Sequence, residues 1–379
     1  MSMVGGSSGT LVDLFCGCGG FSLGAELAGF RSLAAIDIDG TLQSGYRRNF
    51  PSSRAIQASV VDLEGSDWTR LLGGQRPSGV IGGPPCQGFS PIGKRQKDDP
   101  RNSLIGQFIR QVNLLKPKFF IMENVQGLLQ SENRSILDDA LGELAPNYIT
   151  LEPMVVNAAH FGAATARHRV VVIGFDPNEV DAFGVDLFDR RDSSLVTVRD
   201  AISDLPSPIK DAKVEGDFGW AAYPEAEDLS VYAAALRGPP PEGLGSQQAR
   251  EQHSVGLVSG LVETRHSKAI SDRYFSIEGG KSDRTTKSHK LRWDGQCPTL
   301  RAGTGSDRGA FQAVRPLHPA EGRVITVREA ARLQGFPDWF QFHPTKWHSF
   351  RMIGNSVSPF VSRYLLERIA QRMHLALAA

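Results

Sequence analysis

Short apolar runs separated by amphipathic stretches dominate the first half of the chain. The runs that we predict as strands are Val12–Phe15, Leu33–Ile36, Val80–Ile81, Phe119–Met122 and Arg169–Gly174. A helix is predicted over Phe21–Ala28, between the first two runs. Alternation of this kind over residues 11–178 is typical of βαβ units, so the sequence predicts an α/β fold built on a parallel sheet.

The regular pattern is lost between residues 180 and 320, where Gly, Pro, Ser and charged residues prevail. A short capped helix is predicted over Thr197–Ile202, and a longer one follows Thr326, whose hydroxyl can cap it. Pro359 begins a last helix, and its apolar face carries Phe360, Val361, Tyr364, Leu365 and Ile369. We therefore predict a main domain over 11–178, a smaller region over 180–320, and a return segment over 321–379 that completes the main domain.

A glycine loop, Cys16–Gly20, joins the first predicted strand to the first predicted helix. Such a turn lets the backbone approach a nucleotide-like ligand closely. The second strand ends in Asp37, whose carboxylate can accept hydrogen bonds from both ribose hydroxyls. The loop lacks the G-x-G-x-x-G spacing of dinucleotide sites, but together with Asp37 it favours a cofactor that contains adenosine.

A cysteine on a rigid turn follows the run Val80–Ile81. Pro84 and Pro85 fix the backbone ahead of Cys86, so the thiol is presented to a pocket and can act as a nucleophile. Glu123 ends another predicted strand and should reach the same edge of the sheet. Arg167 and Arg169 lie at the mouth of the next strand, where they could hold an anionic or carbonyl group.

Composition narrows the partners and the compartment. Of 379 residues, 40% are hydrophobic and 22% charged, which is ordinary for a water-soluble protein. The net charge is only +1, so binding of nucleic acid requires a local basic face, for which Lys94–Lys97 and Lys281–Arg292 are candidates. Four cysteines without metal-ligand spacing make a zinc site unexpected and favour a reducing cytoplasm. The sequence shows neither a membrane-spanning run nor a signal-peptide core.

Six motifs in order resemble those of the DNA cytosine-C5 methyltransferases. They are Phe15–Gly20, Pro84–Gln87, Glu123–Val125, Arg167–Arg169, Arg328–Pro337 and Gly354–Val357. The resemblance implies a class I S-adenosylmethionine-dependent methyltransferase fold, Rossmann-like, with a target-recognition domain over residues 180–320. It also implies a monomeric enzyme of prokaryotic or phage type. Its substrate would be double-stranded DNA, and a separate restriction endonuclease could accompany it.

The same resemblance implies roles for the candidate catalytic residues. Cys86 would attack C6 of a cytosine flipped out of the duplex, which makes C5 nucleophilic toward the methyl group of S-adenosylmethionine. Glu123 would assist at N3 and at the exocyclic amine, and Arg169 would lie near O2. Arg167 would orient the surrounding loop.

Further residues correspond to the family's binding positions. Those for the cofactor are Phe15, Gly17, Cys18, Gly19, Gly20, Asp37, Ile38, Ser59, Val60, Asp62, Pro85, Asn355 and Val357. Those for DNA are Gln87, Ser90, Arg95, Arg292, Arg301 and Arg308. The family's adenine-binding aspartate is replaced by Ser59 or displaced to Asp62. The Pro-Gln that usually precedes the arginines is Ala164-Thr165 here.

Two alternatives stay open at this point. One is a catalytically inactive DNA-binding relative, although Cys86, Glu123 and the glycine loop are all present. The other is an RNA cytosine methyltransferase of the same fold, because Cys297–Gly305 faintly resembles a segment of the transfer-RNA branch. Pro298 in place of an aromatic residue, and Ser90 in place of threonine, favour DNA.

Overall fold

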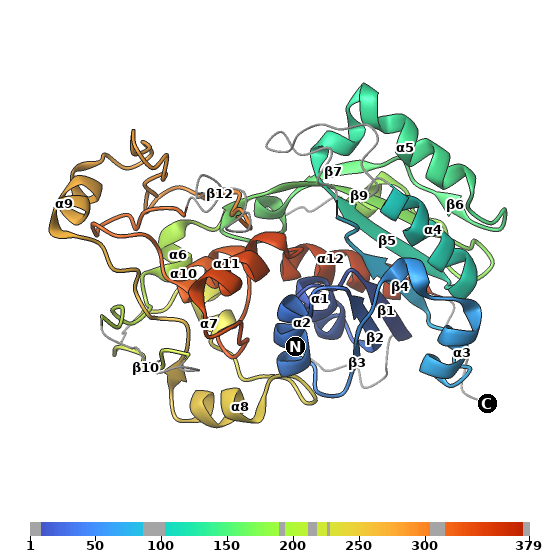
Figure 1. Ribbon diagram of the computed structural model, residues 1–379, viewed down its shortest axis with the longest axis horizontal. Coiled ribbons are helices and arrows are strands. Elements are labelled where there is room, and N and C mark those ends of the chain that lie inside the picture. Colours follow the sequence, from blue (N-terminus) through green and yellow to red (C-terminus); the bar gives the residue numbers. More distant parts are fainter. Residues whose placement is uncertain are drawn as a thin grey trace.

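The computed structural model describes residues 9–85, 103–188, 194–210, 218–225, 228–303 and 315–373. Within these ranges a central sheet has the strand order β3-β2-β1-β4-β5-β9-β6, with β7 also paired to β9 (Figure 1). Its strands are β1 (Gly9–Leu14), β2 (Phe30–Asp37), β3 (Arg54–Gln57), β4 (Gly79–Gly82), β5 (Phe119–Asn124), β6 (Ile149–Thr150), β7 (Met154–Asn157) and β9 (His168–Phe175). The α/β fold class is confirmed, and all five predicted strands are present.

The sheet is mixed, with a parallel and an antiparallel part. Strands β1 to β5 pair in parallel, as the alternating pattern predicts. Strand β9, however, runs antiparallel to β5, β6 and β7, so the prediction of a parallel sheet is wrong there. The physical reason is the connection from β7 to β9, which is a short segment without a crossover helix and can join only antiparallel neighbours. This reversal brings the start of β9 to the edge where the parallel strands end.

Helices cover both faces of the sheet. In β5, Phe119 and Ile121 pack with α1 (Gly20–Leu27) and α12 (Pro359–Ala370). Phe120 and Met122 point to the other face, which is covered by α4 (Ser103–Leu115) and α5 (Ser131–Gly142). The alternation of the strand thus fills two separate cores. The prediction that the last helix packs back on the first domain is confirmed, because Val361, Leu365 and Ile369 of α12 are buried against the sheet.

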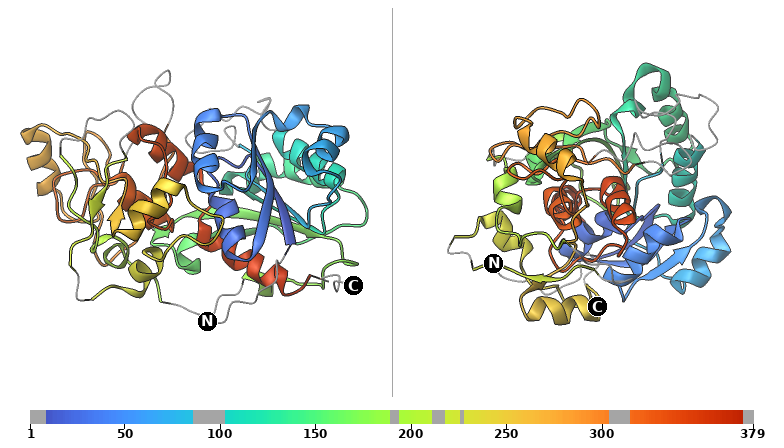
Figure 2. Two further views of the ribbon diagram at one scale, coloured as in Figure 1. Left: turned by 90° about the horizontal axis from the view of Figure 1, so that it is seen from below. Right: turned by 60° about the vertical axis from the view of Figure 1, so that its left-hand side comes forward.

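Short elements beyond β9 gather beside one end of the sheet (Figures 1 and 2). They are α6 (Val198–Ile202), β10 (Ala221–Ala222), α7 (Val231–Leu236), α8 (Gln247–Ser254), β11 (Leu257–Val258), α9 (Lys268–Ser276) and β12 (Cys297–Pro298). The predicted helix caps are confirmed: Thr197 and Thr326 each form a capping box, with Asp200 and Glu329 respectively. The domain boundaries proposed from the sequence stay a prediction.

One core joins this region to the beginning of the chain. Tyr46 and Phe50, at the end of α2 (Gly40–Asn49), stack on each other with ring centroids 4.3 Å apart. Phe50 also packs edge-to-face on Phe340, which follows α10 (Val327–Gln334), with ring centroids 6.1 Å apart. The same cluster includes Tyr232 of α7. Apolar packing therefore connects α2, the region beyond β9 and the return segment.

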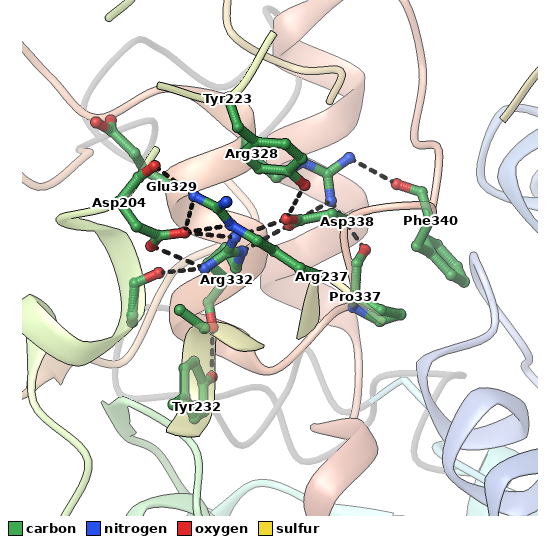
Figure 3. A network of polar contacts seen from close by, with 12 residues as sticks. Asp204, Tyr223, Tyr232, Arg237, Arg328, Glu329, Arg332, Pro337, Asp338 and Phe340 are labelled. Atoms are coloured by element: carbon green, nitrogen blue, oxygen red, sulfur yellow. Dashed lines mark hydrogen bonds and ion pairs between the residues drawn. The ribbon is translucent and has the colours of Figure 1, made fainter. Parts of the chain in front are cut away.

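Helix α10 is buried along its whole length although it carries two arginines. Arg332 donates two hydrogen bonds of 2.6 Å to the carboxylate of Asp338 and reaches Asp204 at 3.1 Å (Figure 3). Both carboxylates are needed, because a buried guanidinium without anionic partners is strongly disfavoured. Burial alone would raise the pKa of Asp338, but Arg332 holds it below its usual value.

Residues from the region beyond β9 complete this network. Tyr223 and Arg237 bind its two carboxylates (Figure 3). Arg328 donates to backbone carbonyl groups, including that of Ser259, and its Nη1 lies 3.8 Å from Asp338 Oδ1. The network therefore connects α10 to four separate positions in the region beyond β9, namely Asp204, Tyr223, Arg237 and Ser259. None of the helices in the described ranges is long and apolar enough to cross a bilayer.

The contact between α1 and α12 generates a stability prediction. A Cβ atom on Gly24 would lie 1.7 Å from Ser362 Oγ and 2.5 Å from the Pro359 carbonyl oxygen. We expect Gly24→Ala to destabilise the fold by about 1–3 kcal/mol through overpacking, measured by urea denaturation. Gly106→Ala is the control, since nothing lies within 4 Å of its Cβ position. There the better helix propensity should stabilise by about 0.5–1 kcal/mol. Equal effects of the two substitutions would contradict the close approach.

The buried network generates a second stability prediction. Arg332→Met should destabilise the protein by roughly 3–5 kcal/mol, because it leaves Asp338 and Asp204 buried without their shared cation. Arg363→Met is the control, since the Arg363–Glu367 pair on α12 is largely exposed and should contribute about 1 kcal/mol or less. Chemical denaturation of both variants compares them. A loss no larger than that of the control would mean that the network contributes little.

Candidate active site

A carboxylate and a guanidinium from neighbouring antiparallel strands meet at the edge of the sheet. Glu123 stands near the end of β5 and is only 9% exposed. Arg169 stands near the start of β9, and its Nε lies 3.0 Å from Glu123 Oε1. Arg169 also donates from Nη1 to the carbonyl of His168 at 2.7 Å. The two sequence-predicted residues therefore form one ion pair.

The glycine-proline turn after β4 begins beside this ion pair. A Cβ atom on Gly83 would lie 3.4 Å from Glu123 Oε2. Asn124 Nδ2 donates to the Pro84 carbonyl at 3.3 Å, which fixes the first part of the turn against the end of β5. The turn leads toward Cys86. That residue, together with Gln87, Ser90, Arg95 and Arg308, lies outside the described residues.

Arg167 connects three parts of the chain behind the ion pair. It is 2% exposed and donates from Nη1 to the carbonyls of Gly354 at 2.9 Å and Leu300 at 3.3 Å. Burial, and next the charge of Arg169, lower the pKa of the Arg167 guanidinium to about 9, so it remains charged at neutral pH. Nearby, β8 (Thr165–Ala166) pairs with β12, and Thr165 donates to the Cys297 carbonyl at 3.0 Å.

A small hollow, partly open to solvent, lies at this point. Its polar side chains include Glu123, Arg167 and Arg169. The rest of the lining is mainly aliphatic: Val156, Ala158, Val171, Val357, Ser358 and Val361. The hollow thus combines hydrogen-bonding groups with apolar surface, as small-molecule sites commonly do.

The glycine loop is built from left-handed backbone conformations. Phe15, Gly17 and Gly19 have φ values of 59°, 55° and 94°. A Cβ on Gly19 would lie 2.3 Å from the Phe50 ring, so only glycine fits there, whereas nothing lies within 4 Å of the Cβ position of Gly17. A left-handed phenylalanine costs free energy and is maintained only where the surroundings impose it. The loop thus leaves open space above Gly17.

Asp37 closes the other side of this loop. Its Oδ2 accepts a hydrogen bond from Gly17 N and its Oδ1 from Asp39 N, both at 2.8 Å. Burial raises the pKa of Asp37, and those two backbone donors oppose the increase. The neighbouring Ile38 is 70% exposed, an unusual setting for an isoleucine. An exposed aliphatic side chain can pack on the face of a base, and the neighbouring carboxylate can accept hydrogen bonds from the ribose attached to that base.

Ser59 and Asp62, the two sequence-predicted candidates for contact with an adenine, lie in the next turn. Ala58 N donates to the Asp37 carbonyl at 3.1 Å, which places Ser59 directly after the residue bonded to Asp37. Ser59 Oγ accepts from Val61 N at 3.3 Å, Val60 is buried and Asp62 is exposed. Because Ser59 is closer along the chain to the residue bonded to Asp37, it is favoured over Asp62 for the contact with an adenine.

The return segment lies against the glycine loop. Cys18 Sγ is 3.1 Å from Ser356 Oγ, and a Cβ on Gly20 would lie 2.5 Å from the Val357 carbonyl oxygen. Asn355, at the end of α11 (Lys346–Asn355), is exposed beside these contacts. The first and last motifs of the chain are therefore neighbours in space.

The described cysteines are poor nucleophiles. Cys16, Cys18 and Cys297 are free and buried. Burial raises the pKa of each thiol, that of Cys18 to about 12, so their thiolate fractions at neutral pH are very small. Cys86 is the remaining cysteine of the chain.

The predicted DNA-binding arginines differ in their surroundings. The backbone at Arg301 passes so close to Gly354 that a Cβ there would lie 2.5 Å from the Arg301 carbonyl carbon. Arg301 is therefore near the return segment, and it is exposed. Arg292 donates from Nε and Nη2 to the carboxylate of Asp294 at 3.0 and 2.7 Å. A phosphate would have to compete with that carboxylate.

Sequence reasoning missed two residues that shape the site. Asn124 ties the turn after β4 to β5, and its position directly after Glu123 was a signal that could have indicated a role. Thr165 ties β8 to β12, and it replaces the glutamine usual in the related motif.

Comparison with known proteins agrees with this geometry. Residues 9–371 match the family described as C-5 cytosine-specific DNA methylase. The chain is 42% identical over 360 residues to the Type II methyltransferase M.XorII of Xanthomonas oryzae pv. oryzae, covering 93% of this chain and 82% of that protein. It is 30% identical over 395 residues to the Type II methyltransferase M.DdeI of Desulfomicrobium norvegicum, covering 95% and 88%.

A solved structure gives the same result. A putative DNA modification methyltransferase encoded within a prophage of Escherichia coli superposes with a TM-score of 0.83 at 38% identity, covering 94% of this chain and 97% of that one. The fold and the site edge thus define a class I methyltransferase. The chain belongs to the C-5 cytosine-specific DNA methylase family.

The Glu123–Arg169 pair generates a prediction about activity. Glu123→Gln keeps the size of the side chain but removes its ionisable proton, so turnover should fall by roughly 10²–10⁴, the usual range for general acid–base catalysis. Methyl transfer from labelled cofactor to DNA measures this, and DNA binding should be retained. Glu152→Gln is the control, because the Glu152 side chain is 74% exposed and forms a surface ion pair with Arg134. Wild-type turnover in Glu123→Gln would remove Glu123 from the chemistry.

Proposed function

We propose that this protein methylates C5 of cytosine in a specific sequence of double-stranded DNA, with S-adenosylmethionine as methyl donor and Cys86 as covalent nucleophile. The observation that carries the proposal is the Glu123–Arg169 ion pair beside the first residues of the turn that leads to Cys86. A carboxyl group, a guanidinium and a thiol can then act on one ring. Family membership supports the reaction class.

The proposed reaction begins with the Cys86 thiolate, which forms a bond to C6 of the target cytosine. Electron density moves toward N3, where Glu123 supplies a proton, and Arg169 binds O2. C5 becomes enamine-like and takes up a methyl group, whose bond to the sulfonium sulfur of the donor breaks to leave a neutral thioether. A base then removes the C5 proton, N3 returns its proton to Glu123 as the Cys86–C6 bond breaks, and the thiolate and 5-methylcytosine are released. Each bond that forms on the enzyme is broken again, so the protein is unchanged.

S-adenosylmethionine would supply an electrophilic methyl group carried on a sulfonium. The residues present fit this cofactor. Asp37 offers carboxylate oxygens to a ribose, Ile38 offers an exposed apolar surface to adenine, and the space at Gly17 lets a ligand approach the backbone. Phe15, Cys18, Gly19, Gly20, Ser59, Val60, Pro85, Asn355 and Val357 would complete the surroundings of the cofactor.

The target cytosine must leave the duplex to reach a thiol and a carboxylate at the edge of the sheet. The region beyond β9 would face the DNA and read its sequence, with Arg292 and Arg301 among the candidate contacts. Because the net charge is only +1, these contacts would have to be local. The Type II relatives suggest that a restriction endonuclease with the same target acts separately, and we expect the methyltransferase to act as a monomer.

Bisulfite sequencing of DNA from cells that express the chain tests the proposal directly. Methylation of every copy of one short motif is expected. Parallel labelling of DNA and RNA with tritiated cofactor addresses the alternatives. Label in RNA alone would identify an RNA methyltransferase, and label in neither, with DNA still bound, would identify an inactive relative.

The covalent step generates its own prediction. A duplex with 5-fluorocytosine at the target position cannot lose the C5 substituent, so wild type should form an adduct that survives denaturation. Cys86→Ala should form none and should lose methyl transfer, while its affinity for the cofactor stays nearly unchanged. Gel electrophoresis and peptide mass spectrometry locate the adduct. Cys297→Ala is the control and should still be trapped. An adduct on any cysteine other than Cys86 would falsify the assignment.

A further inference from the structure

The turn Asp37–Ile38–Asp39 at the end of β2 has its shape fixed by backbone hydrogen bonds. Asp37 accepts from Gly17 N on one carboxylate oxygen and from Asp39 N on the other. The first bond ties the turn to the glycine loop and the second closes the turn on itself. Ile38 lies between the two aspartates and points its side chain outward, with 70% exposed. Any shift of Asp39 would therefore move Asp37 and Ile38, the two residues proposed to bind the adenosine part of the cofactor.

Asp39 is held by two different partners. Its Oδ1 caps α2 by accepting from Thr41 N and Leu42 N, both at 3.0 Å. Its Oδ2 pairs with Arg351 Nη2 at 2.6 Å. Burial by itself would raise the pKa of Asp39, but the Leu42 N–H and the Arg351 ion pair bring it below the usual value. The carboxylate thus stays ionised between a helix N-terminus and an arginine.

Arg351 comes from the far end of the chain. It lies on α11, one helical turn before Asn355, and α11 packs against α2. Its guanidinium is also 5.8 Å from the centre of the Trp347 ring, which restrains the side chain from its own helix. The ion pair is about one-quarter exposed on each side, 28% for Arg351 and 24% for Asp39. It is therefore better shielded than the Arg363–Glu367 pair on α12, at 47% and 42%.

The return segment consequently contacts two parts of the proposed cofactor site. Cys18–Ser356 and Gly20–Val357 hold it to the glycine loop, and Arg351–Asp39 holds it to the turn after β2. Arg351 also offsets a local excess of negative charge, because burial and the neighbouring Asp39 both raise the pKa of Asp37. Without this cation two adjacent carboxylates would repel each other at the cofactor edge.

We propose that Arg351 is a positioning residue for the cofactor, acting through Asp39. The ion pair keeps the turn that carries Asp37 and Ile38 in register with the segment that carries Asn355, so that one cofactor molecule can contact both. Arg351 itself touches neither. The inference rests on the proposed S-adenosylmethionine site and adds to it a residue that none of the sequence motifs assigned.

Calorimetric titration with S-adenosylmethionine and with S-adenosylhomocysteine tests this in the full-length protein. Arg351→Gln removes the positive charge of the ion pair. Asp39→Asn removes its negative charge but keeps a side-chain oxygen that can cap α2. Each variant should lose roughly three- to tenfold in affinity for both ligands, and the double variant should lose no more than either single one. Arg363→Gln, which removes an ion pair confined to α12, should bind like wild type.

Steady-state kinetics separate positioning from general damage. In Arg351→Gln the KM for the cofactor should rise, while kcat at saturating cofactor and the KM for DNA stay close to wild type. Arg351→Lys restores a positive charge and should recover most of the lost affinity. A purely structural role would instead lower the thermal midpoint, and would reduce kcat in proportion to the fraction of unfolded protein.

Asp37→Ala in the same titrations keeps the two proposals distinguishable. If Asp37→Ala weakens binding and Arg351→Gln does not, the inference about Arg351 is wrong and the cofactor site stands. If Asp37→Ala also binds normally, the cofactor is not held at this turn and both are wrong. Additive losses in the double variant, or an effect of Arg351→Gln without one of Asp39→Asn, would show that Arg351 does not act through Asp39.

Discussion

The antiparallel pairing of β9 with β5 is the constraint on which the site depends. In a sheet that was parallel throughout, the start of β9 would lie at the opposite edge from the end of β5. Arg169 and Glu123 would then be separated by the length of a strand. Because β9 is reversed, both lie at one edge with the ends of β1, β2 and β4. The same reversal places Arg167, just before β9, where it donates to the carbonyls of Leu300 and Gly354.

Local features of the fold could be predicted from the sequence because they depend on nearby residues. The strand–loop–helix at the N-terminus, the capped helices at Thr197 and Thr326, and the apolar face of α12 all follow from spacing within a few turns. Strand direction could not be predicted, since an apolar run is the same in either orientation. The placement of Glu123 at the edge was predicted correctly because its strand is one of the parallel ones.

Contacts between distant segments were beyond the sequence pattern. Nothing in the residues around Arg351 indicates Asp39 as its partner, and nothing around Arg332 indicates Asp204. Such pairs depend on how the return segment packs, which is decided by the apolar core around Tyr46 and Phe340. The network on α10 can specify one arrangement of these segments. Buried charges add little net stability, but each must keep its oppositely charged partners, so few other packings are compatible with them. Asp204 and Tyr223 thus restrict how the region beyond β9 can sit on α10.

The adjacency of the first and last motifs has a consequence during synthesis. Gly17 and Asp37 leave the ribosome well before Val357, which closes their surroundings and follows Asp37 by 320 residues (357 − 37). At about 5–20 residues per second, the interval is on the order of 20–70 s. Throughout that time the nascent chain carries only part of the proposed cofactor site, so binding there does not yet stabilise it by mass action. A chain gains stability from binding at the proposed site only after synthesis has passed Val357, which makes binding a test of translation through that segment.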